Sequence, residues 1–383
     1  MKAPTVSADA SASSARMARL LDRRRNYRAE LQTAAAARQF CIAYGCGTVF
    51  LNIVKTWSQY VARRFDFCCD ADPSKWGKTF SLIPCISPSE LIDIKADSSV
   101  FVALGDFRPA MHFLARNEFP HASLIYKYDL VSSALVSDPS LDLHRISEKL
   151  AMVRSMLADK LSAQVFDAIV NRVLDASSPV GLMADVCQGD QYFPADIIRL
   201  RSDEVFVDVG AYTGDTASDF VARTHGRFDS IHCFEVDSLN FEILQKTVSA
   251  LENRSRIHLH PQGLWNQPQD ISYSLEETQS SLGEGNALGQ VVRLDDVIKE
   301  ARVTFLKMDI EGAELKALEG ARKTILANKP KLAICIYHHF RDLWEIPLLI
   351  KTLVPEYRLF LRHHTNLEYE SVCYAVLPED APE

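Results

Sequence analysis

Two glycines between two carboxylates form the most distinctive stretch of this sequence. Residues 205–216 read VFVDVGAYTGDT, with Asp208 and Asp215 on either side of Gly210 and Gly214. The apolar, β-branched start predicts a buried strand, and the glycines predict a tight turn that leads into a helix. Nearby carboxylates disfavour a phosphate, which the exposed N–H groups of such a turn would otherwise attract. The turn therefore favours a cationic or hydroxyl-rich ligand, and S-adenosylmethionine, with its sulfonium, ammonium and ribose, has both properties.

A further carboxylate, Glu235, directly follows the next predicted strand, residues 230–234. An acid at the end of the second strand of a nucleotide-binding unit is placed to accept hydrogen bonds from both ribose hydroxyls. The alternative is a cap for the helix predicted from about Ser238, a role that suits Asp237 better. We favour ribose binding for Glu235 and keep Asp237 among the cofactor-binding candidates.

Three acids stand close together after another predicted strand, residues 303–308. They are Asp309, Glu311 and Glu314. Open α/β sheets bind ligands at the carboxyl ends of their strands, so we expect these three acids to lie at a ligand site. The alternative places Glu311 and Glu314 in the first turn of a helix, whose dipole stabilises negative charge. Oxygens of Asp309 and Glu311 would suit Mg²⁺, but the sequence does not require a metal, and we assign no metal ligand.

Two pairs of histidines follow predicted strands near the end of the chain. His338 and His339 come after residues 331–337, and His363 and His364 come after the next strand. A single histidine is usually a surface or core residue, but a pair at a strand end of this type of sheet points toward the ligand crevice. Neutral imidazole is available near pH 7, so His338 or His339 is our candidate general base. His363 and His364 are candidates for substrate contact.

Two shorter segments complete the candidate site. Gly263 and Leu264 follow the predicted strand 257–260, where a small residue and an apolar one could border an adenine ring. Tyr192 belongs to the segment DQYF (190–193), just before the strand that leads to the glycine turn. An aromatic and amide cluster on a loop is usually local packing, but this one could also cover a ligand. Tyr192 is therefore a candidate substrate contact.

Positioning these residues requires a sheet whose strands alternate with helices. Strand-like runs begin at residues 205, 231, 257, 303, 332, 357 and 371. They predict an α/β fold with a seven-stranded, Rossmann-like sheet. The last two runs are too close for an intervening helix, so they should form an antiparallel hairpin at one edge. Such an ending is typical of methyltransferases rather than of dinucleotide-binding domains.

A smaller α/β unit precedes this sheet. A predicted strand (40–44), the glycines Gly45 and Gly47, a helix and a second strand (65–69) with an acidic end follow the order of a βαβ unit. The third position of its glycine pattern is Phe50, and a bulky residue there disfavours a bound dinucleotide.

The composition is that of an ordinary globular chain. Its 383 residues are enough for two domains, and 47% hydrophobic and 24% charged residues are typical values. The net charge of −8 argues against a nucleic-acid partner, which would favour a basic surface. Nine cysteines without metal-ligand spacing fit reduced thiols, and no apolar run approaches the roughly 18 residues of a membrane span. We expect a cytoplasmic protein without a transmembrane segment, and a homo-oligomer is compatible with these numbers.

The motifs resemble those of the FkbM family of S-adenosylmethionine-dependent methyltransferases. The similar segments are DQYF (190–193), FVDVGAYTGDT (206–216), FE-x-D (234–237), KMDIEGAE (307–314), IYHH (336–339) and LRHH with the closing strand (361–376). The resemblance implies methyl transfer to a hydroxyl, often on a sugar, with S-adenosyl-L-methionine as the cofactor. It implies a cofactor site that includes Asp208, Gly210, Gly214, Glu235 and Asp309. Ala211 and Asp215 in the same turn complete our cofactor-binding candidates.

The first α/β unit resembles the amino-terminal modules of polysaccharide-modifying enzymes, through its glycine turn, the segment from Asp70 to Gly77 and the segment from Ile83 to Leu91. That resemblance implies nucleotide or sugar-nucleotide binding, but we favour the alternative of a purely structural role. We divide the chain into a disordered start and basic helix (1–38), a Rossmann-like module (39–140), a helical connector and flap (141–200) and a methyltransferase domain (201–383).

The sequence thus predicts an O-methyltransferase that acts on a sugar-containing acceptor. His338 or His339 would take the acceptor proton, with Glu311 or Glu314 orienting the acceptor. One alternative is a nucleotide- or nucleotide-sugar-binding protein whose methyltransferase domain is inactive. Another is a nitrogen acceptor or a small metabolite, because nothing in the sequence identifies the acceptor.

Overall fold

The structure is a computed structural model of the chain, and it divides into two compact units. One lies within Met1–Glu148 and Val170–Pro179, and the other within Lys149–Ile169 and Val180–Glu383. Most of the predicted segment 1–38 lies outside the described residues. The structure describes residues 15, 18, 29–104, 107–125, 142–174, 183–273, 287–299, 302–366 and 369–381.

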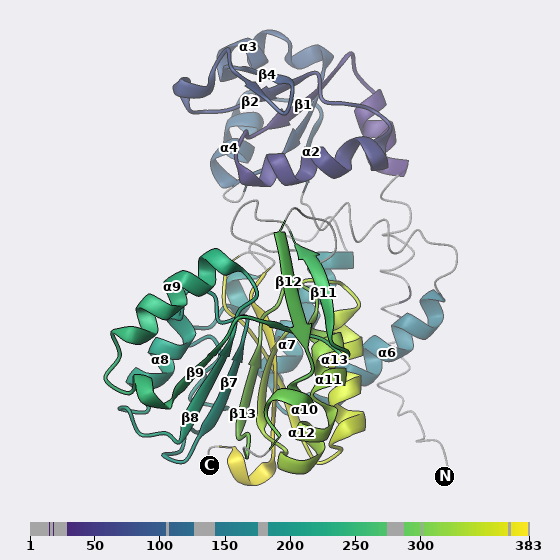
Figure 1. Ribbon diagram of the computed structural model, residues 1–383. Helices are drawn as coiled ribbons and strands as arrows, with labels where there is room; N and C mark the ends of the chain where they lie inside the picture. Colours follow the sequence, from purple (N-terminus) through teal and green to yellow (C-terminus); the bar gives the residue numbers. More distant parts are fainter. Residues whose placement is uncertain are drawn as a thin grey trace. The chain divides into compact units, whose positions relative to one another are not determined.

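The first unit is built on a six-stranded sheet (Figure 1). In the order in which they lie side by side, its strands are β3 (Thr79–Phe80), β4 (Ile83–Ile86), β2 (Phe67–Cys69), β1 (Phe40–Tyr44), β5 (Ser98–Val102) and β6 (Ala122–Leu124). Neighbouring strands are parallel except for β3 and β4. The described helices of this part of the chain include α2 (Thr48–Val61), α3 (Pro88–Asp93) and α4 (Arg108–Arg116). The predicted smaller α/β domain is therefore confirmed.

The glycine turn of this unit is held by its own side chains. The carboxylate of Asp70, at the end of β2, accepts a hydrogen bond from the N–H of Cys46 at 2.9 Å and pairs with Lys75 at 2.8 Å. Phe50 is fully buried, with its ring 6.3 Å from that of Phe65. The acid that would hold a ribose in a dinucleotide-binding unit thus binds the turn itself.

The second unit contains the predicted seven-stranded sheet. In spatial order its strands are β15 (Arg358–His363), β16 (Ser371–Val376), β14 (Lys331–Cys335), β13 (Phe305–Met308), β7 (Val205–Val209), β8 (Ser230–Phe234) and β9 (Ile257–His260). The strands from β14 to β9 run parallel, and β16 runs antiparallel to both of its neighbours. The seven strands and the closing hairpin are confirmed. The carboxyl ends of β7, β8, β13 and β14 meet at one edge of the sheet, which places their acids and histidines together.

Helices separate the parallel strands. They are α8 (Asp215–Arg223), α9 (Ser238–Ser249), α10 (Leu294–Val297), α11 (Glu314–Gly320), α12 (Arg322–Asn328) and α13 (Asp342–Leu353). In Figure 1, α8 and α9 lie on the side of β8 and β9, and α10 to α13 lie beyond β13. The predicted connector supplies α6 (Leu143–Met156) and α7 (Lys160–Leu174), and the hydroxyl of Ser162 on α7 accepts a hydrogen bond from the N–H of Leu361 at 2.9 Å.

A small three-stranded sheet was not predicted. It has the order β10 (Gly263–Leu264), β12 (Ala287–Val292) and β11 (Gln269–Tyr273). β10 has only two residues, too few to show a period in the sequence, and its partner β12 follows much later in the chain. The pairing fixes Gly263 and Leu264 beside the carboxyl end of the main sheet.

Aromatic packing fixes the segment 190–193 against the sheet. Phe206 on β7 stacks on Phe220 of α8 with ring centroids 4.6 Å apart, and Phe305 of β13 lies 5.1 Å from Phe206. Phe193 meets Phe305 edge-on at 5.7 Å. Because Phe193 is anchored in this core, its neighbour Tyr192 is held at the edge where the strands end. In the part of the chain that the structure describes, no helix has both the length and the apolar character that a membrane crossing requires.

Candidate active site

The glycine turn between β7 and α8 requires its glycines for space as well as for backbone angles. Gly210 has φ +74°, and a Cβ there would lie 1.8 Å from the carbonyl oxygen of Asp309. Gly214 has φ +88° and immediately precedes α8, whose first residue is Asp215. This close approach joins the turn to the end of β13, so two parts of the predicted site meet here.

Glu235 lies at the end of β8 and faces the glycine turn. Its two carboxylate oxygens accept hydrogen bonds from the N–H groups of Tyr212 and Asp237, both at 2.8 Å. Burial raises the pKa of Glu235 to about 7, although these two N–H groups act in the opposite direction. The Asp237 side chain caps α9 by accepting from the N–H groups of Leu239 and Asn240 at 2.8 and 3.0 Å. Asp237 is thus the N-terminal cap of α9, the alternative role that the sequence suggested for an acid at this position.

Asp208 lies beneath the turn and forms an ion pair with Lys307 that was not predicted. Its carboxylate is 3.0 Å from Nζ of Lys307, and both side chains are almost fully buried. Nζ of Lys307 also donates a hydrogen bond to the carbonyl oxygen of Gly210 at 2.7 Å and lies 4.9 Å above the ring of Tyr192. Burial would lower the pKa of Lys307, but the carboxylates of Asp208 and Asp309 outweigh it and keep the amine protonated. The pair therefore supports the floor of the site.

Asp309 is held by two tyrosines. Its carboxylate accepts hydrogen bonds from the hydroxyl of Tyr192 at 2.6 Å and from that of Tyr337 at 3.0 Å. Burial would raise the pKa of Asp309, but the charges of Lys307 and His338 and the two hydroxyl donors together lower it below its usual value. Asp309 is thus an anion with a fixed orientation.

His338 lies among three carboxylates. Its Nε2 is 3.5 Å from Asp309 and 3.4 Å from Glu311, and its Nδ1 is 3.1 Å from Glu314. Burial alone would lower the pKa of His338, but these carboxylates, Glu314 foremost, raise it well above its usual value. The ring therefore holds its proton at neutral pH, whereas a general base must begin without one. Glu314 is fully buried and belongs to α11, and its carboxylate also accepts from the N–H of Ile310 at 2.8 Å.

The other predicted histidines lie elsewhere. His339 is 46% exposed and pairs with Asp342 at 3.4 Å. His363 is fully buried, with Nδ1 2.8 Å from the hydroxyl of Ser371. Nε2 of His364 is 2.9 Å from the hydroxyl of Tyr374. The imidazoles of His339, His363 and His364 do not line the cavity that most of the predicted cofactor-binding residues surround.

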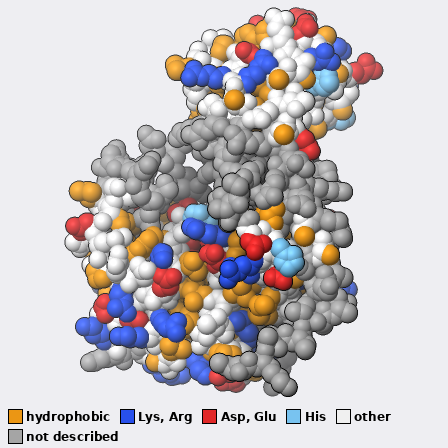
Figure 2. Space-filling model, turned by 90° about the vertical axis from the view of Figure 1, so that its right-hand side faces the viewer, with side chains coloured by type: hydrophobic (Ala, Val, Ile, Leu, Met, Phe, Trp, Pro, Cys, Tyr) orange, Lys and Arg blue, Asp and Glu red, His pale blue; other side chains and the backbone are white. Residues whose placement is uncertain are grey.

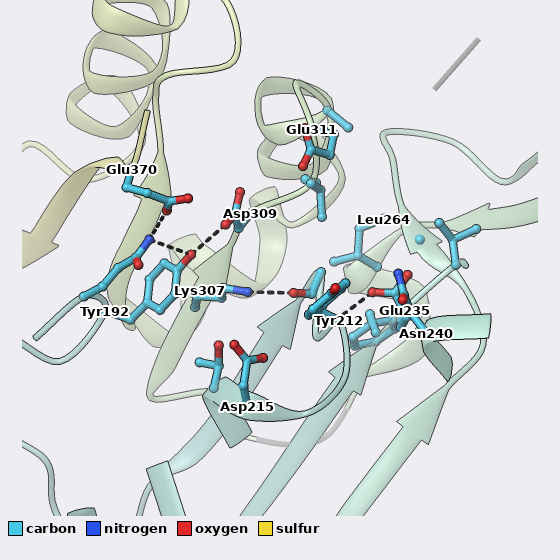
Figure 3. A pocket seen from close by; sticks show the side chains of 18 of the residues that line it. Tyr192, Tyr212, Asp215, Glu235, Asn240, Leu264, Lys307, Asp309, Glu311 and Glu370 are labelled. Atoms are coloured by element: carbon cyan, nitrogen blue, oxygen red, sulfur yellow. Dashed lines mark hydrogen bonds between the residues drawn. The ribbon is translucent and has the colours of Figure 1, made fainter. Parts of the chain in front are cut away.

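That cavity has a volume of about 320 Å³ and opens at the carboxyl ends of the strands (Figure 3). A space of this size suits a small ligand or cofactor. The predicted residues that line it are Tyr192, Gly210, Asp215, Glu235, Gly263, Leu264, Asp309 and Glu311. Ala211 is fully buried in the turn, and Asp208, Gly214, Asp237, Glu314 and His338 support the lining from behind. The structure therefore brings most of the cofactor candidates together and separates three of the histidines from them.

Several lining residues were not among the predicted site residues. They include Gln191, Tyr212, Asn240, Lys307, Tyr337 and Glu370. A sequence signal existed for Lys307. It is the one charged residue in the apolar run 303–308, and Asp208 is the one charged residue in the apolar run 205–209. Buried charges are usually paired, so each could have predicted the other. Glu370 had no such signal, since it precedes the last strand and reaches the cavity only through the antiparallel hairpin.

Backbone strain gathers around the cavity. Tyr192, Tyr212, Glu311 and Glu370 all line it and have φ values of +68°, +47°, +54° and +69°. Non-glycine residues rarely adopt such angles, and when they do they cluster at functional sites. The backbone angles of these four residues thus favour this cavity as the candidate site of the second unit.

Comparison with known proteins agrees with this location. Residues 208–368 match the family model described as methyltransferase FkbM domain, which spans the glycine turn, Glu235, Asp309 and the histidines. Among curated proteins, no sequence matches the chain.

One solved structure shares the fold of this chain. The crystal structure of methyltransferase FkbM from Methylobacillus flagellatus KT is 23% identical, with a TM-score of 0.78, and the match covers 96% of this chain and 100% of that one. An rRNA methylase from Streptococcus thermophilus is 16% identical over 48% of this chain and 91% of its own, with a TM-score of 0.31. The first of these structures shows that the whole two-unit architecture occurs in another chain. With its glycine turn and its acidic cavity, the second unit contains a segment, residues 208–368, that matches the methyltransferase FkbM domain.

Proposed function

We propose that this chain is an S-adenosylmethionine-dependent O-methyltransferase that methylates a sugar hydroxyl of a glycan or glycosylated metabolite. The distribution of charge in the cavity carries this proposal. One part is apolar, with Val236 and Leu264 beside the carboxylate of Glu235, and the other is acidic, with Asp309 and Glu311. A ligand with an aromatic base, neighbouring hydroxyls and a positive charge matches both parts.

The residues present fit this cofactor. Each carboxylate oxygen of Glu235 accepts one backbone N–H, which leaves further lone pairs for two ribose hydroxyls. Leu264 and Val291 offer apolar contact to an adenine. When bound, S-adenosylmethionine supplies a methyl group on a sulfonium, which the acceptor oxygen takes as the S–CH3 bond breaks and the hydroxyl proton leaves. Asp309 and Asp215 attract that positive charge electrostatically.

The acceptor would lie against the polar part of the cavity. Gln191, Tyr337 and Glu370 line it there with amide, hydroxyl and carboxylate groups that can bind sugar hydroxyls. Glu311 touches the cavity directly and contacts His338, so we propose that this pair receives the acceptor proton. His338 can do so only after it has lost the proton that its carboxylate neighbours hold on it. His339 remains a prediction without contact to the cavity.

The surface is consistent with a non-nucleic-acid acceptor. The chain carries a net charge of −8. On the face drawn in Figure 2, basic and acidic side chains are interspersed among hydrophobic ones and do not form one broad basic surface. Strong binding to RNA or DNA would need such a surface.

Calorimetric titration with S-adenosylmethionine tests the cofactor site. We expect the wild type to bind it and Glu235→Ala to weaken binding roughly 10- to 100-fold, because hydrogen bonds to a charged group contribute about 1.5–3 kcal/mol. Glu242→Ala, an exposed glutamate on α9, is the matched control and should bind like the wild type. The proposed cofactor site is contradicted if the wild type does not bind S-adenosylmethionine, or if Glu235→Ala binds it as tightly as the wild type does.

The acceptor is tested separately with a methyl-labelled donor. Nucleotide-sugars, oligosaccharides and an RNA fragment are offered in parallel, and label on a sugar hydroxyl is the expected result. Label on RNA or on nitrogen, with none on the sugars, would contradict this part of the proposal.

A further inference from the structure

Four side chains behind and along the cavity wall combine the donor types that bind metal ions. They are His338, Asp309, Glu311 and Glu314, contributed by the ends of β13 and β14 and the start of α11. Three carboxylates thus face one imidazole, and among the described residues Lys307 adds a positive charge close by, in its own pair with Asp208. The cluster therefore carries an excess of negative charge in a place with little water.

Three buried polar atoms of this cluster lack hydrogen-bond partners among the described residues. The His338 side chain is only 7% exposed, and neither of its ring nitrogens has hydrogen-bond geometry to a partner among the described residues. Oε2 of Glu314, a fully buried side chain, also has no hydrogen-bond partner there. Such atoms are costly unless a cation or another partner satisfies them. This observation is independent of the charge count, and it points to a cation as the partner of these atoms.

The distances suit an ion held on Nε2 of His338. Donor atoms that bind one ion at about 2.1 Å lie about 3.0 to 3.4 Å apart when they are neighbours in the coordination shell. Nε2 is 3.5 Å from Oδ1 of Asp309 and 3.4 Å from Oε2 of Glu311. Glu314 belongs to the same cluster, since its donor atom lies within 4.8 Å of those of Asp309 and His338.

The other contacts of His338 and Asp309 resemble the hydrogen bonds that hold metal ligands in place from behind. Glu314 lies 3.1 Å from Nδ1, on the other side of the ring, where a carboxylate fixes the orientation of a metal-bound histidine. The hydroxyls of Tyr192 and Tyr337 hold Asp309 in the same way.

We propose that His338, Asp309 and Glu311 bind a divalent transition-metal ion at the acceptor side of the cavity, with Glu314 as the positioning residue behind His338. One imidazole with two carboxylates suits Mn²⁺ or a related ion better than a thiolate-binding one. Asp309 and Glu311 line the cavity, so the open positions of the ion face the acceptor. When bound, the ion would replace the proton on Nε2 of His338 and would make an acceptor hydroxyl more acidic. Because His338 and Glu311 would then be ligands of the ion, the hydroxyl proton would pass to water in place of this pair. This catalytic role rests on the proposed function, whereas ion binding does not.

Mn²⁺ is the probe, because free and bound Mn²⁺ differ in their electron paramagnetic resonance signal. The full chain is titrated with Mn²⁺ in the absence of any substrate. We expect one bound ion per chain in the wild type. His338→Gln and Glu311→Gln should weaken binding by at least tenfold, and Glu314→Gln by about 10- to 100-fold, the usual effect of losing an outer-shell partner. His339→Gln is the matched control, since its ring faces Asp342, and it should bind like the wild type.

Two outcomes overturn the proposal: a wild type without a bound ion, or equal Mn²⁺ affinity in the wild type, His338→Gln and Glu311→Gln. Glu311 is 28% exposed, so Glu311→Gln keeps the test valid if His338→Gln does not fold. Titration of the same proteins with S-adenosylhomocysteine separates the two proposals. Cofactor binding without Mn²⁺ binding overturns the metal site alone, and Mn²⁺ binding without cofactor binding overturns the proposed function alone.

Discussion

Burial of Glu235 sets the pH range in which its carboxylate is ionised. In the folded chain its pKa is raised from 4.5 to about 7 by burial. Only the ionised carboxylate can accept hydrogen bonds from both ribose hydroxyls. Cofactor affinity should therefore approach its full value at about pH 8 and should fall as the pH decreases through 7.

Between pH 8 and pH 6 the ionised fraction of such a group falls about tenfold, so the dissociation constant should rise by about the same factor. Calorimetric titration with S-adenosylhomocysteine across this range measures it. The Glu235→Gln variant should bind weakly at every pH, with no such slope. An equally steep slope in that variant would assign the effect to another group.

At the scale of elements, a buried ion pair joins the two central strands. Asp208 of β7 and Lys307 of β13 are directly opposite in the parallel register. Removing one partner of a buried pair leaves an uncompensated charge and typically costs about 3–5 kcal/mol. Lys307→Met should therefore lower the free energy of unfolding by about that amount, as measured by urea denaturation.

A second substitution shows whether this cost comes from the unpaired charge. Adding Asp208→Asn to Lys307→Met should recover part of the lost stability. Lys316→Met, at an exposed pair with Glu319, is the control and should change stability by less than about 0.5 kcal/mol. If Lys307→Met behaves like this control, the pair does not hold β7 and β13 together.

At the scale of the whole molecule, each compact unit has its own sheet and its own buried core. The cavity belongs to the second unit. A ligand present at 100 times its dissociation constant stabilises the form that binds it by about 2.7 kcal/mol. Hydrogen exchange with S-adenosylhomocysteine should therefore slow at β7, β8 and β13 and stay unchanged at β1 and α2.

The same exchange measurement with a nucleotide-sugar addresses the first unit. Because Asp70 is already bonded to Cys46 and Lys75, we expect no added protection at the turn of Gly45. Protection there would instead favour the reading of this chain as a nucleotide-sugar-binding protein.

The sequence by itself determined the helices and strands of the second unit, and also the edge of the sheet at which the candidate site lies. Apolar runs that stop at glycine or acid are local signals, because each strand must be buried and must end where a polar ligand can approach. The seven strands, the closing hairpin and the placement of Glu235 and Asp309 at one edge follow from such signals and are observed.

Tertiary structure alone decided which side chains point into the cavity. His338 and His339 are neighbours in sequence, yet one contacts the carboxylates of β13 and α11 and the other faces Asp342 at 46% exposure. Glu370 reaches the cavity because β16 returns antiparallel beside β14, a pairing across many residues that no local pattern encodes. Burial and charge pairing depend on such distant neighbours, so the protonation of His338 and the raised pKa of Glu235 could be read only from the folded chain.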